Sequence, residues 1–291
     1  MKKIKPKVII VCGPTASGKS DFAINLVRNK FFGEAEIISA DSRQVYKGLE
    51  FFSGAILEKE MRGIKHHLIS FLDINENFTV FNFQREATKI IQKIIKKDKI
   101  PIIVGGSGFF MESLIYKNLL PEIDPNKKLR EKLEKKNTEE LYKMLLKQDK
   151  KRAENIDKKN KRRLIRSLEI IDKIGFFPII QREINDNYTF EIYYSNLTKE
   201  VLNKKIEENF LRRVDKLIKE GEKINKIVSK KKFKQLGLAF KFINDFWDNK
   251  ISKDEFIKLG IREEQKYAKR QKTFLKKFLE NLPKDIKKFD F

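Results

Sequence analysis

The residues with the clearest chemical purpose lie near the start of the chain, in the segment GPTASGKS. This segment satisfies G-x-x-x-x-G-K-[ST] through Gly13, Gly18, Lys19 and Ser20. Glycines let backbone N–H groups curl around an anion, and the helix that follows adds its positive N-terminal end. The lysine supplies charge to the terminal phosphates, and the serine hydroxyl reaches Mg²⁺. The motif therefore predicts a polyphosphate site built from Gly13, Pro14, Thr15, Ala16, Ser17, Gly18, Lys19 and Ser20, with Ser20 as the Mg²⁺ contact.

Most loops of this type bind ATP or GTP, so nucleotide binding is the first expectation. A kinase or NTPase also needs a second carboxylate for the metal at a strand end. No apolar run in this chain ends in an Asp followed by a hydrolytic Glu or Gln. The nearest strand-end acid is Asp41, in SADSRQVYKG. Its place suits a general base or a metal contact; the alternative is a solvated turn aspartate that caps a helix.

The chain is strongly basic, and its densest basic cluster is KKNKRRLIR at 158–166. Lys and Arg number 65 against 41 Asp and Glu, for a formal charge of +24. Such a surplus favours a polyanionic partner, such as nucleic acid, or a membrane surface. Arg163 and Arg166 stand about one helical turn apart and should share a face. The alternatives are a compositional bias towards lysine and an ordinary solvated helix face.

Alternating strands and helices must position these residues. Short apolar runs predict strands, and apolar residues at helical spacing predict the helices between them. The expected order is strand 8–12, helix 21–29, strand 36–39, helix 81–97 and strand 100–104. This order predicts an α/β fold: a P-loop NTPase-like parallel sheet flanked by helices. The Gly13 loop, Asp41 and the Gly105 loop then converge at the carboxyl ends of the strands.

The character of the sequence changes after about residue 117. Pro121 and Pro125 interrupt the chain, and the charged stretch 126–173 is almost free of glycine, with leucines spaced for short amphipathic helices. A strand expected at 190–194 returns to the sheet. We therefore predict a catalytic core of residues 1–117 and 192–291, which ends in helices, and a helical insertion domain at 118–191.

Several classes of protein are disfavoured. The single cysteine, Cys12, allows no disulfide within the chain, and with His66 and His67 it offers no structural zinc site. The adjacent histidines point to opposite faces of a strand, which favours packing roles. No run approaches 18 apolar residues, and the short apolar run after the basic N-terminus leads straight into the glycine loop. We expect a cytoplasmic protein without a membrane segment, and a monomer.

Together these segments resemble the tRNA dimethylallyltransferase (tRNA isopentenyltransferase) family. The resemblance rests on GPTASGKS, ISADSRQVYKGLEFFSGA, KHHLISFLDINENFTVFNFQREA, PIIVGGSGFFMESLIY, RRLIRSLEI and YAKRQKTFL, in the family's order and spacing. It implies transfer of a dimethylallyl group from dimethylallyl diphosphate to N6 of adenosine 37, next to the tRNA anticodon, with release of diphosphate. The partners implied are the tRNA anticodon stem-loop and dimethylallyl diphosphate, and the cofactor is Mg²⁺.

The resemblance also implies residue roles. Asp41 matches the catalytic aspartate, Ser107 stands where the family usually has Thr, and Lys19 would neutralise the leaving diphosphate. The stretches implied to contact tRNA are Asp41, Ser42, Arg43 and Gln44, and Arg162, Arg163, Leu164, Ile165 and Arg166. Further candidates are Arg130, Lys234 and Arg270.

The chain departs from the family pattern in its last third. Lys234 occupies the position of a family arginine, which keeps the charge but loses the two-pronged hydrogen-bonding fork. Glu264 and Gln265 replace a Thr-Arg pair, and Phe274 replaces a tryptophan. Three other functions stay open: an adenylate isopentenyltransferase acting on free AMP, a P-loop kinase, and a non-catalytic RNA-binding protein. The basic insertion argues against the first, because AMP needs no such arm.

Overall fold

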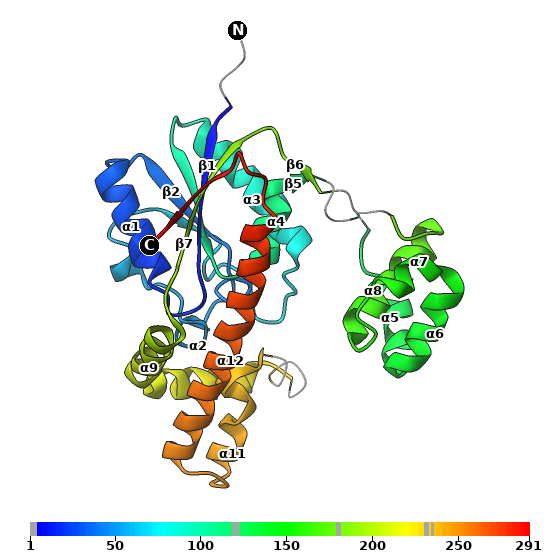
Figure 1. Ribbon diagram of the computed structural model, residues 1–291. Coiled ribbons are helices and arrows are strands. Elements are labelled where there is room, and N and C mark those ends of the chain that lie inside the picture. Colours follow the sequence, from blue (N-terminus) through cyan, green and yellow to red (C-terminus); the bar gives the residue numbers. More distant parts are fainter. Residues whose placement is uncertain (1–4, 118–120, 122, 179–181, 230–232, 234–235) are drawn as a thin grey trace. The chain divides into compact units, whose positions relative to one another are not determined.

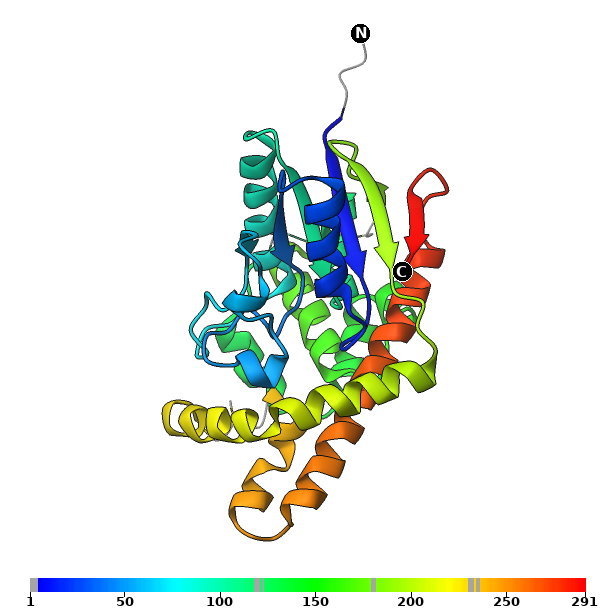
Figure 2. The same cartoon turned by 90° about the vertical axis from the view of Figure 1, so that its left-hand side faces the viewer.

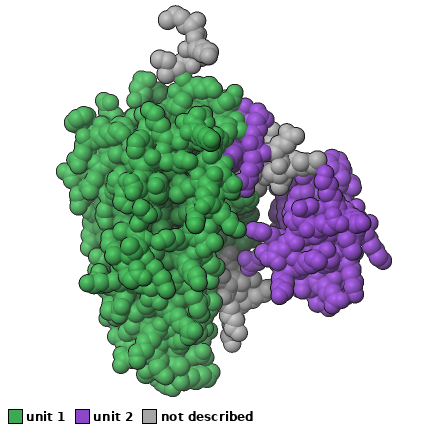
Figure 3. All heavy atoms as spheres, in the orientation of Figure 1, with its two compact units in different colours: residues 1–115, 184–291 green, residues 116–183 purple. Residues whose placement is uncertain are grey.

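The protein divides into two compact units. A computed structural model describes residues 5–117, 121, 123–178, 182–229, 233 and 236–291 (Figure 1). One unit comprises residues 1–115 and 184–291, and the other comprises residues 116–183 (Figure 3). The second border therefore lies at 183, whereas the sequence placed it at 191. The strand that returns to the sheet begins at Thr189, and the residues just before it, from Ile184 on, already belong to the first unit.

The first unit is built on a parallel six-stranded sheet of order β3-β2-β4-β1-β7-β8. Its strands, in chain order, are β1 (Lys7–Cys12), β2 (Ala35–Ser39), β3 (His66–His67), β4 (Ile100–Gly105), β7 (Thr189–Tyr194) and β8 (Lys287–Asp290). Central strands covered on both faces read as continuous apolar runs, and β1 is buried everywhere except at Lys7. The predicted α/β fold class with a parallel sheet is confirmed. The edge strand β3 holds the histidine pair that was expected on a strand, whereas the edge strand β8 was not predicted because it is fully exposed.

Helices cover both faces of this sheet. Figure 1 shows α1 (Lys19–Lys30) on one face, with α3 (Val80–Ile95) and α4 (Gly108–Ile115) on the other. Thr79 begins α3 because its hydroxyl accepts from the N–H of Asn82, whose side chain reaches back to the cap. The short helices α2 (Glu50–Ser53) and η1 (Glu58–Glu60) lie between β2 and β3, and a third short helix, η2 (Leu238–Lys241), lies later in the chain.

Two long helices complete the first unit near the carboxyl ends of the strands. In Figures 1 and 2, α9 (Lys199–Ile227) crosses beneath these ends and α12 (Lys253–Glu280) rises past it, with the short α11 (Ile243–Trp247) between them in sequence. Thr198 and Ser252 cap the two long helices. Phenylalanines from α9, η2 and α12 (Phe210, Phe240 and Phe256) are fully buried together, so both helices are held firmly where the sheet's ligand edge lies.

The second unit is a small helical domain. It contains α5 (Lys127–Glu134), α6 (Thr138–Gln148), α7 (Lys150–Glu154) and α8 (Lys161–Ile174); β5 (Tyr116–Lys117) and β6 (Glu183–Ile184) pair as a two-stranded sheet. Each helix begins at an Asn or Asp whose side chain accepts a backbone N–H, and α8 ends at Gly175, whose φ is 85°. Leucines and isoleucines of α6 and α8 form its core.

No helix in the described part of the chain combines the length and the apolar character needed to cross a membrane.

Candidate active site

The glycine loop has the geometry that the motif requires. It leaves β1 at Cys12, and the N–H of Gly13 donates to the carbonyl oxygen of Gly105 at 3.3 Å. Gly18 adopts a φ of 85°, a left-handed conformation that favours glycine, and α1 begins at the next residue. A Cβ added at Gly13 would stand 2.5 Å from Ser17 Oγ, so the loop leaves no room for a larger residue there. Within the described residues the buried Ser17 hydroxyl has no hydrogen-bond partner.

Lys19 is buried inside the loop that it serves. Its side chain is 8% exposed, and Nζ donates to the Pro14 carbonyl at 3.2 Å. Burial lowers the pKa of Lys19, and the negative charge of Asp41 opposes that shift. A desolvated ammonium is costly unless it meets an anion. The site is therefore arranged to gain stability when an anionic group enters beside Lys19.

Asp41 and Ser107 are brought together by the register of the sheet. Cys12 pairs with Gly105, and Ser39 pairs with Val104, so the three loops start side by side. Ser107 N–H donates to the Ala40 carbonyl and its hydroxyl accepts from Ser42 N–H, both at 3.2 Å. The predicted convergence of these loops is thus present in the structure. Gly105 must be glycine, because a Cβ would stand 2.2 Å from the Ala40 carbonyl oxygen.

Asp41 is 7% exposed and has one oxygen engaged: Oδ1 accepts from the N–H of Arg43 at 2.9 Å. This bond forms an Asx-turn, in which the aspartate side chain stabilises the backbone of the loop that contains it. The sequence left two roles open for Asp41, a base and a turn residue. Its geometry serves the turn and still places a carboxylate at the ligand edge of the sheet.

Arg43 and Gln44 lie beside Asp41, and both are held by protein partners. The Arg43 guanidinium donates to the Leu236 carbonyl, and its central carbon lies 5.3 Å from the centre of the Tyr267 ring. Gln44 accepts from the Ser39 hydroxyl at 3.1 Å. Burial raises the pKa of Tyr267 to about 12, so this phenol stays neutral under Arg43. Arg43 and Gln44, which were expected to contact tRNA, therefore also hold neighbouring parts of the protein together.

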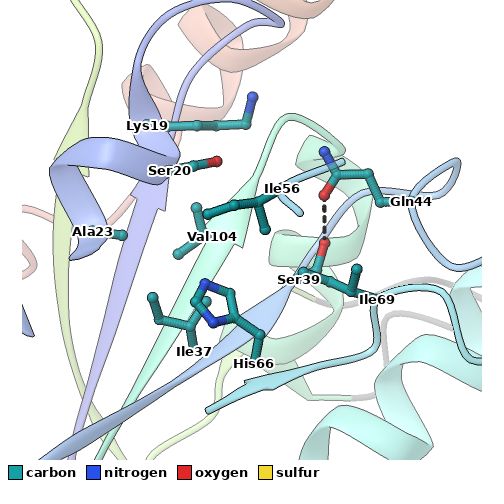
Figure 4. A pocket seen from close by; sticks show the side chains of 10 residues that line it. All are labelled: Lys19, Ser20, Ala23, Ile37, Ser39, Gln44, Ile56, His66, Ile69 and Val104. Carbon is teal, nitrogen blue, oxygen red and sulfur yellow. Dashed lines mark hydrogen bonds between the residues drawn. The ribbon is translucent and has the colours of Figure 1, made fainter. Parts of the chain in front are cut away.

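A pocket opens next to the glycine loop (Figure 4). Lys19 and Ser20 stand at one end of it, and its walls are mostly apolar. Its lining residues are Lys19, Ser20, Ala23, Ile37, Ser39, Gln44, Ile56, His66, Ile69 and Val104. His66 Nδ1 lies 2.8 Å from the Ile64 carbonyl oxygen; because a carbonyl only accepts, Nδ1 carries the proton. Burial lowers the pKa of His66, which leaves a neutral ring in this wall.

The structure adds two side chains that sequence reasoning missed or left unassigned. Lys205 of α9 places Nζ 4.0 Å from where a Gly18 Cβ would be, and it makes no hydrogen bond or ion pair within the described residues. Gln271 of α12 accepts from the N–H of Thr15 at 2.9 Å. Lys205 had no distinguishing signal, because lysines are frequent throughout its helix. The only signal for Gln271 was its place in YAKRQ.

The predicted tRNA-contacting stretch in the helical unit divides into two groups. Arg162 and Arg163 are exposed, whereas Leu164 and Ile165 are 0% and 2% exposed in the unit's core. A direct tRNA contact by these two apolar side chains does not fit their burial, so the expectation narrows to the arginines. Arg166 is half-buried and donates to the Ile123 carbonyl at 2.7 Å.

The further candidates also differ. Arg130 forms a two-pronged ion pair with Glu169, at 3.0 and 2.5 Å, and Glu169 is 1% exposed. This pair makes Arg130 part of the domain's architecture. Arg270 is exposed on α12, with its guanidinium carbon 5.9 Å from the centre of the Tyr267 ring. Lys234 lies outside the described residues.

Other titratable residues have structural roles. His67 Nε2 lies 2.7 Å from Glu36 Oε2, while His66 faces the pocket, so the adjacent histidines serve different partners. Burial raises the pKa of the Cys12 thiol to about 12, which leaves it protonated and unreactive. Among the residues that the structure describes, no group of three or more His, Cys, Asp or Glu is gathered to hold a metal ion.

Comparisons with known proteins find relatives along most of this chain. The family described as IPP transferase matches residues 44–278. The chain is similar to the tRNA dimethylallyltransferase of Clostridioides difficile (strain 630), with 36% identity over 291 residues that cover 96% of this chain and 90% of the relative. It is also similar to the tRNA dimethylallyltransferase of Ligilactobacillus salivarius (strain UCC118), with 34% identity over 97% of this chain and 96% of the relative.

Solved structures show the same likeness. The full-length tRNA isopentenylpyrophosphate transferase of Bacillus halodurans aligns with a TM-score of 0.68 and 30% identity, over 98% of this chain and 90% of that one. A eukaryotic dimethylallyltransferase described as acting on tRNA aligns with a TM-score of 0.80 and 25% identity, over 98% of this chain and 74% of the other.

Proposed function

The chain belongs to the IPP transferase family, and from this membership we propose that it transfers a dimethylallyl group to tRNA. The donor is dimethylallyl diphosphate, the acceptor is N6 of adenosine 37 beside the anticodon, and the second product is diphosphate. One observation carries the proposal: the glycine loop, Asp41 and Ser107 meet at one edge of the sheet in a chain whose relatives along nearly its whole length are tRNA dimethylallyltransferases.

The glycine loop suits the diphosphate. In the transfer, the bond between C1 of the dimethylallyl group and the diphosphate oxygen breaks, and negative charge builds on that oxygen. Lys19 and the N–H groups of the loop stabilise the charge, and they are fixed before the reaction begins. Lys205, with no protein partner within the described residues, adds a second ammonium from the side of α9.

Asp41 suits the acceptor. The N6 amine is a poor nucleophile because its lone pair is delocalised into the adenine ring. As N6 forms its bond to C1, one N6 proton must leave, and the Asp41 carboxylate is the base that we assign to accept it. Oδ1 is held by the N–H of Arg43, which orients the group. General-base assistance of this kind contributes about 10²–10⁴-fold to a rate.

Mg²⁺ is the cofactor that fits the donor set. This ion prefers oxygen ligands and is held by one or two protein groups together with substrate phosphates and waters. Ser20 is half-buried in the first turn of α1 and lines the pocket beside Lys19, so its hydroxyl is the protein ligand that we assign. Bound Mg²⁺ would neutralise charge on the diphosphate as it leaves.

The RNA is held by basic side chains that are exposed to solvent. Adenosine 37 lies in a folded loop and must leave its stack, which costs a few kcal/mol. Contacts between basic side chains and RNA phosphates offset that cost. Arg162 and Arg163 of the helical unit are exposed, and so is Arg270 on α12. We assign these three arginines to the RNA backbone.

The test is a transfer assay with labelled dimethylallyl diphosphate and Mg²⁺, run separately with total tRNA and with AMP. We expect label on tRNA, and mass analysis of its nucleosides should find N6-dimethylallyladenosine at position 37. Label only on AMP would mean an adenylate isopentenyltransferase. Phosphate transfer from ATP without prenyl transfer would mean a kinase. The relatives' names, which specify tRNA, disfavour both.

A further inference from the structure

One stripe of α12 contacts all three loops of the proposed active site. Tyr267, Gln271 and Phe274 follow each other at spacings of three and four residues, so they share one face of the helix. Tyr267 lies under Arg43, in the loop that follows Asp41. A Cβ at Gly108 would stand 2.2 Å from the Phe274 ring, so this ring sits against the start of α4. Gln271 lies between these two contacts.

Gln271 joins the glycine loop to the Gly105 loop directly. Its side chain is only 6% exposed. Oε1 accepts from the N–H of Thr15 at 2.9 Å, and Nε2 donates to the carbonyl of Gly106 at 3.3 Å. The amide approaches so closely that a Cβ at Gly106 would stand 2.3 Å from Nε2. The same Cβ would stand 2.9 Å from the Gly13 carbonyl oxygen, so the second glycine of the GGSG segment lets both Gln271 and the glycine loop approach closely.

We propose that Gln271 is a positioning residue for the transfer: it sets the diphosphate-holding loop against the loop that carries Ser107 and abuts Asp41. This inference rests on the proposed function. Both loops already meet through one backbone bond, from Gly13 N–H to the Gly105 carbonyl. Gln271 adds a second tie, between Thr15 and Gly106, which fixes the relative orientation of the loops as well as their separation.

The amide suits this role better than a charged side chain. One neutral group supplies both an acceptor for Thr15 and a donor for Gly106, so neither buried backbone group is left unpaired. A glutamate could accept from Thr15 but would face the Gly106 carbonyl with oxygen, and its charge would repel the diphosphate. Misplacement of reacting groups by about 1 Å can cost about 10²-fold in rate. A loosened glycine loop should therefore lose catalysis before it loses the fold.

The experiment compares Gln271→Met with the wild type. Methionine keeps the buried volume and removes both hydrogen bonds. We expect kcat/KM for dimethylallyl diphosphate to fall about 10-fold or more, with a higher KM for that substrate, an unchanged KM for tRNA and a Tm near that of the wild type. Gln271→Glu should be worse than Gln271→Met, because it adds repulsion. Lys276→Met, which places the same residue on the exposed face of α12, is the control and should leave these constants unchanged.

A second readout separates this proposal from the assigned reaction. Binding of inorganic diphosphate with Mg²⁺, measured by calorimetry, should weaken about 10-fold in Gln271→Met. A wild type that binds diphosphate but transfers no prenyl group would overturn the proposed function, and the binding comparison would still test Gln271. If Gln271→Met bound diphosphate as the wild type does, or raised both KM values equally together with a large loss of Tm, Gln271 would be an ordinary packing residue.

Discussion

The two units of the protein use charge in opposite ways. In the first unit, Lys19 and Asp41 are almost fully buried, at 8% and 7% exposed, and each is held by a backbone partner. In the helical unit, Arg162 and Arg163 are exposed to solvent. Charges in a site shielded from water act strongly over short distances, whereas exposed charges are weakened by salt. The first arrangement suits bond-breaking, and the second suits reversible attachment to a polyanion.

Not every basic residue of the helical unit is exposed and free to bind a polyanion. Arg130 pairs with the buried Glu169, and Arg166 donates to the Ile123 carbonyl. These arginines hold α5 and the segment before it against α8. The basic count of the insertion therefore overstates its capacity for RNA. The comparison predicts that variants at Lys19 and Asp41 change catalysis and that variants at Arg162 and Arg163 change affinity for tRNA.

The largest effect is expected for Asp41→Asn. The amide keeps the size of the side chain and an acceptor for the N–H of Arg43, but it cannot take the N6 proton. We expect kcat to fall by about 10²–10⁴-fold, with tRNA affinity changed less than about 3-fold. Single-turnover transfer and equilibrium tRNA binding measure the two quantities. An equal loss in both would show that Asp41 acts through the shape of its loop, which would break the contrast between the units.

Lys19→Ala should come next. Removing a fixed charge from a developing oxyanion costs about 10²–10³-fold in kcat/KM for dimethylallyl diphosphate. Filter binding should show tRNA affinity retained. If tRNA affinity fell together with activity, the glycine loop would be part of the RNA surface and the division of labour would not hold.

Lys19 also predicts a pH dependence. Because burial lowers the pKa of Lys19, its charge is lost at a lower pH than that of an ordinary lysine as the solution becomes alkaline. The kcat/KM for dimethylallyl diphosphate should therefore fall on the alkaline side earlier than a lysine of normal pKa would cause. Bound diphosphate favours the charged form, so kcat at saturation should fall later. Coincident alkaline limbs in the two profiles would contradict this assignment.

The sequence predicted features that depend on neighbouring residues better than features that depend on the packing of distant helices. The glycine loop is a local structure: Gly13 and Gly18 are needed by close contacts and backbone angles within a few residues, so a short motif identifies it. Asp41 and Ser107 follow from the rule that parallel strands end at one edge. Lys205 and Gln271 come from helices far along the chain, and helical periodicity identifies only their apolar neighbours. Which polar residue of such a helix reaches the loop depends on how the helix packs.

In the helical unit, burial separates residues that the resemblance grouped together. The stretch 162–166 was expected to contact tRNA as a block, because the resemblance covers it as a block. Helical geometry divides it: Leu164 and Ile165 face the core with Leu168, while Arg162 and Arg163 face solvent. A helical period of 3.6 residues, applied to the basic cluster, is enough to separate the apolar pair from the exposed arginines.

A smaller effect is expected from Arg162→Ala combined with Arg163→Ala. Loss of two phosphate contacts should weaken tRNA binding about 10-fold at moderate salt and make it less sensitive to salt. The KM for dimethylallyl diphosphate should stay unchanged. Lys143→Ala with Lys147→Ala removes two charges from the exposed face of α6 in the same unit and serves as the control. Equal losses in both double variants would mean that net charge, not position, attracts the RNA.

The smallest effect is expected at Lys205, whose exposure lies between that of the buried Lys19 and that of the exposed arginines. It belongs to the first unit and approaches Gly18, yet its side chain is only half-buried. An ion pair open to solvent contributes at most about 1 kcal/mol, so Lys205→Gln should raise the KM for dimethylallyl diphosphate about 2- to 5-fold. The loss should shrink as salt increases, whereas the loss in Lys19→Ala should not. Lys204→Gln, at the exposed neighbouring position, controls for the change in net charge. A salt-independent loss at Lys205 above about 10-fold would place this residue with Lys19, as a desolvated contact of the diphosphate.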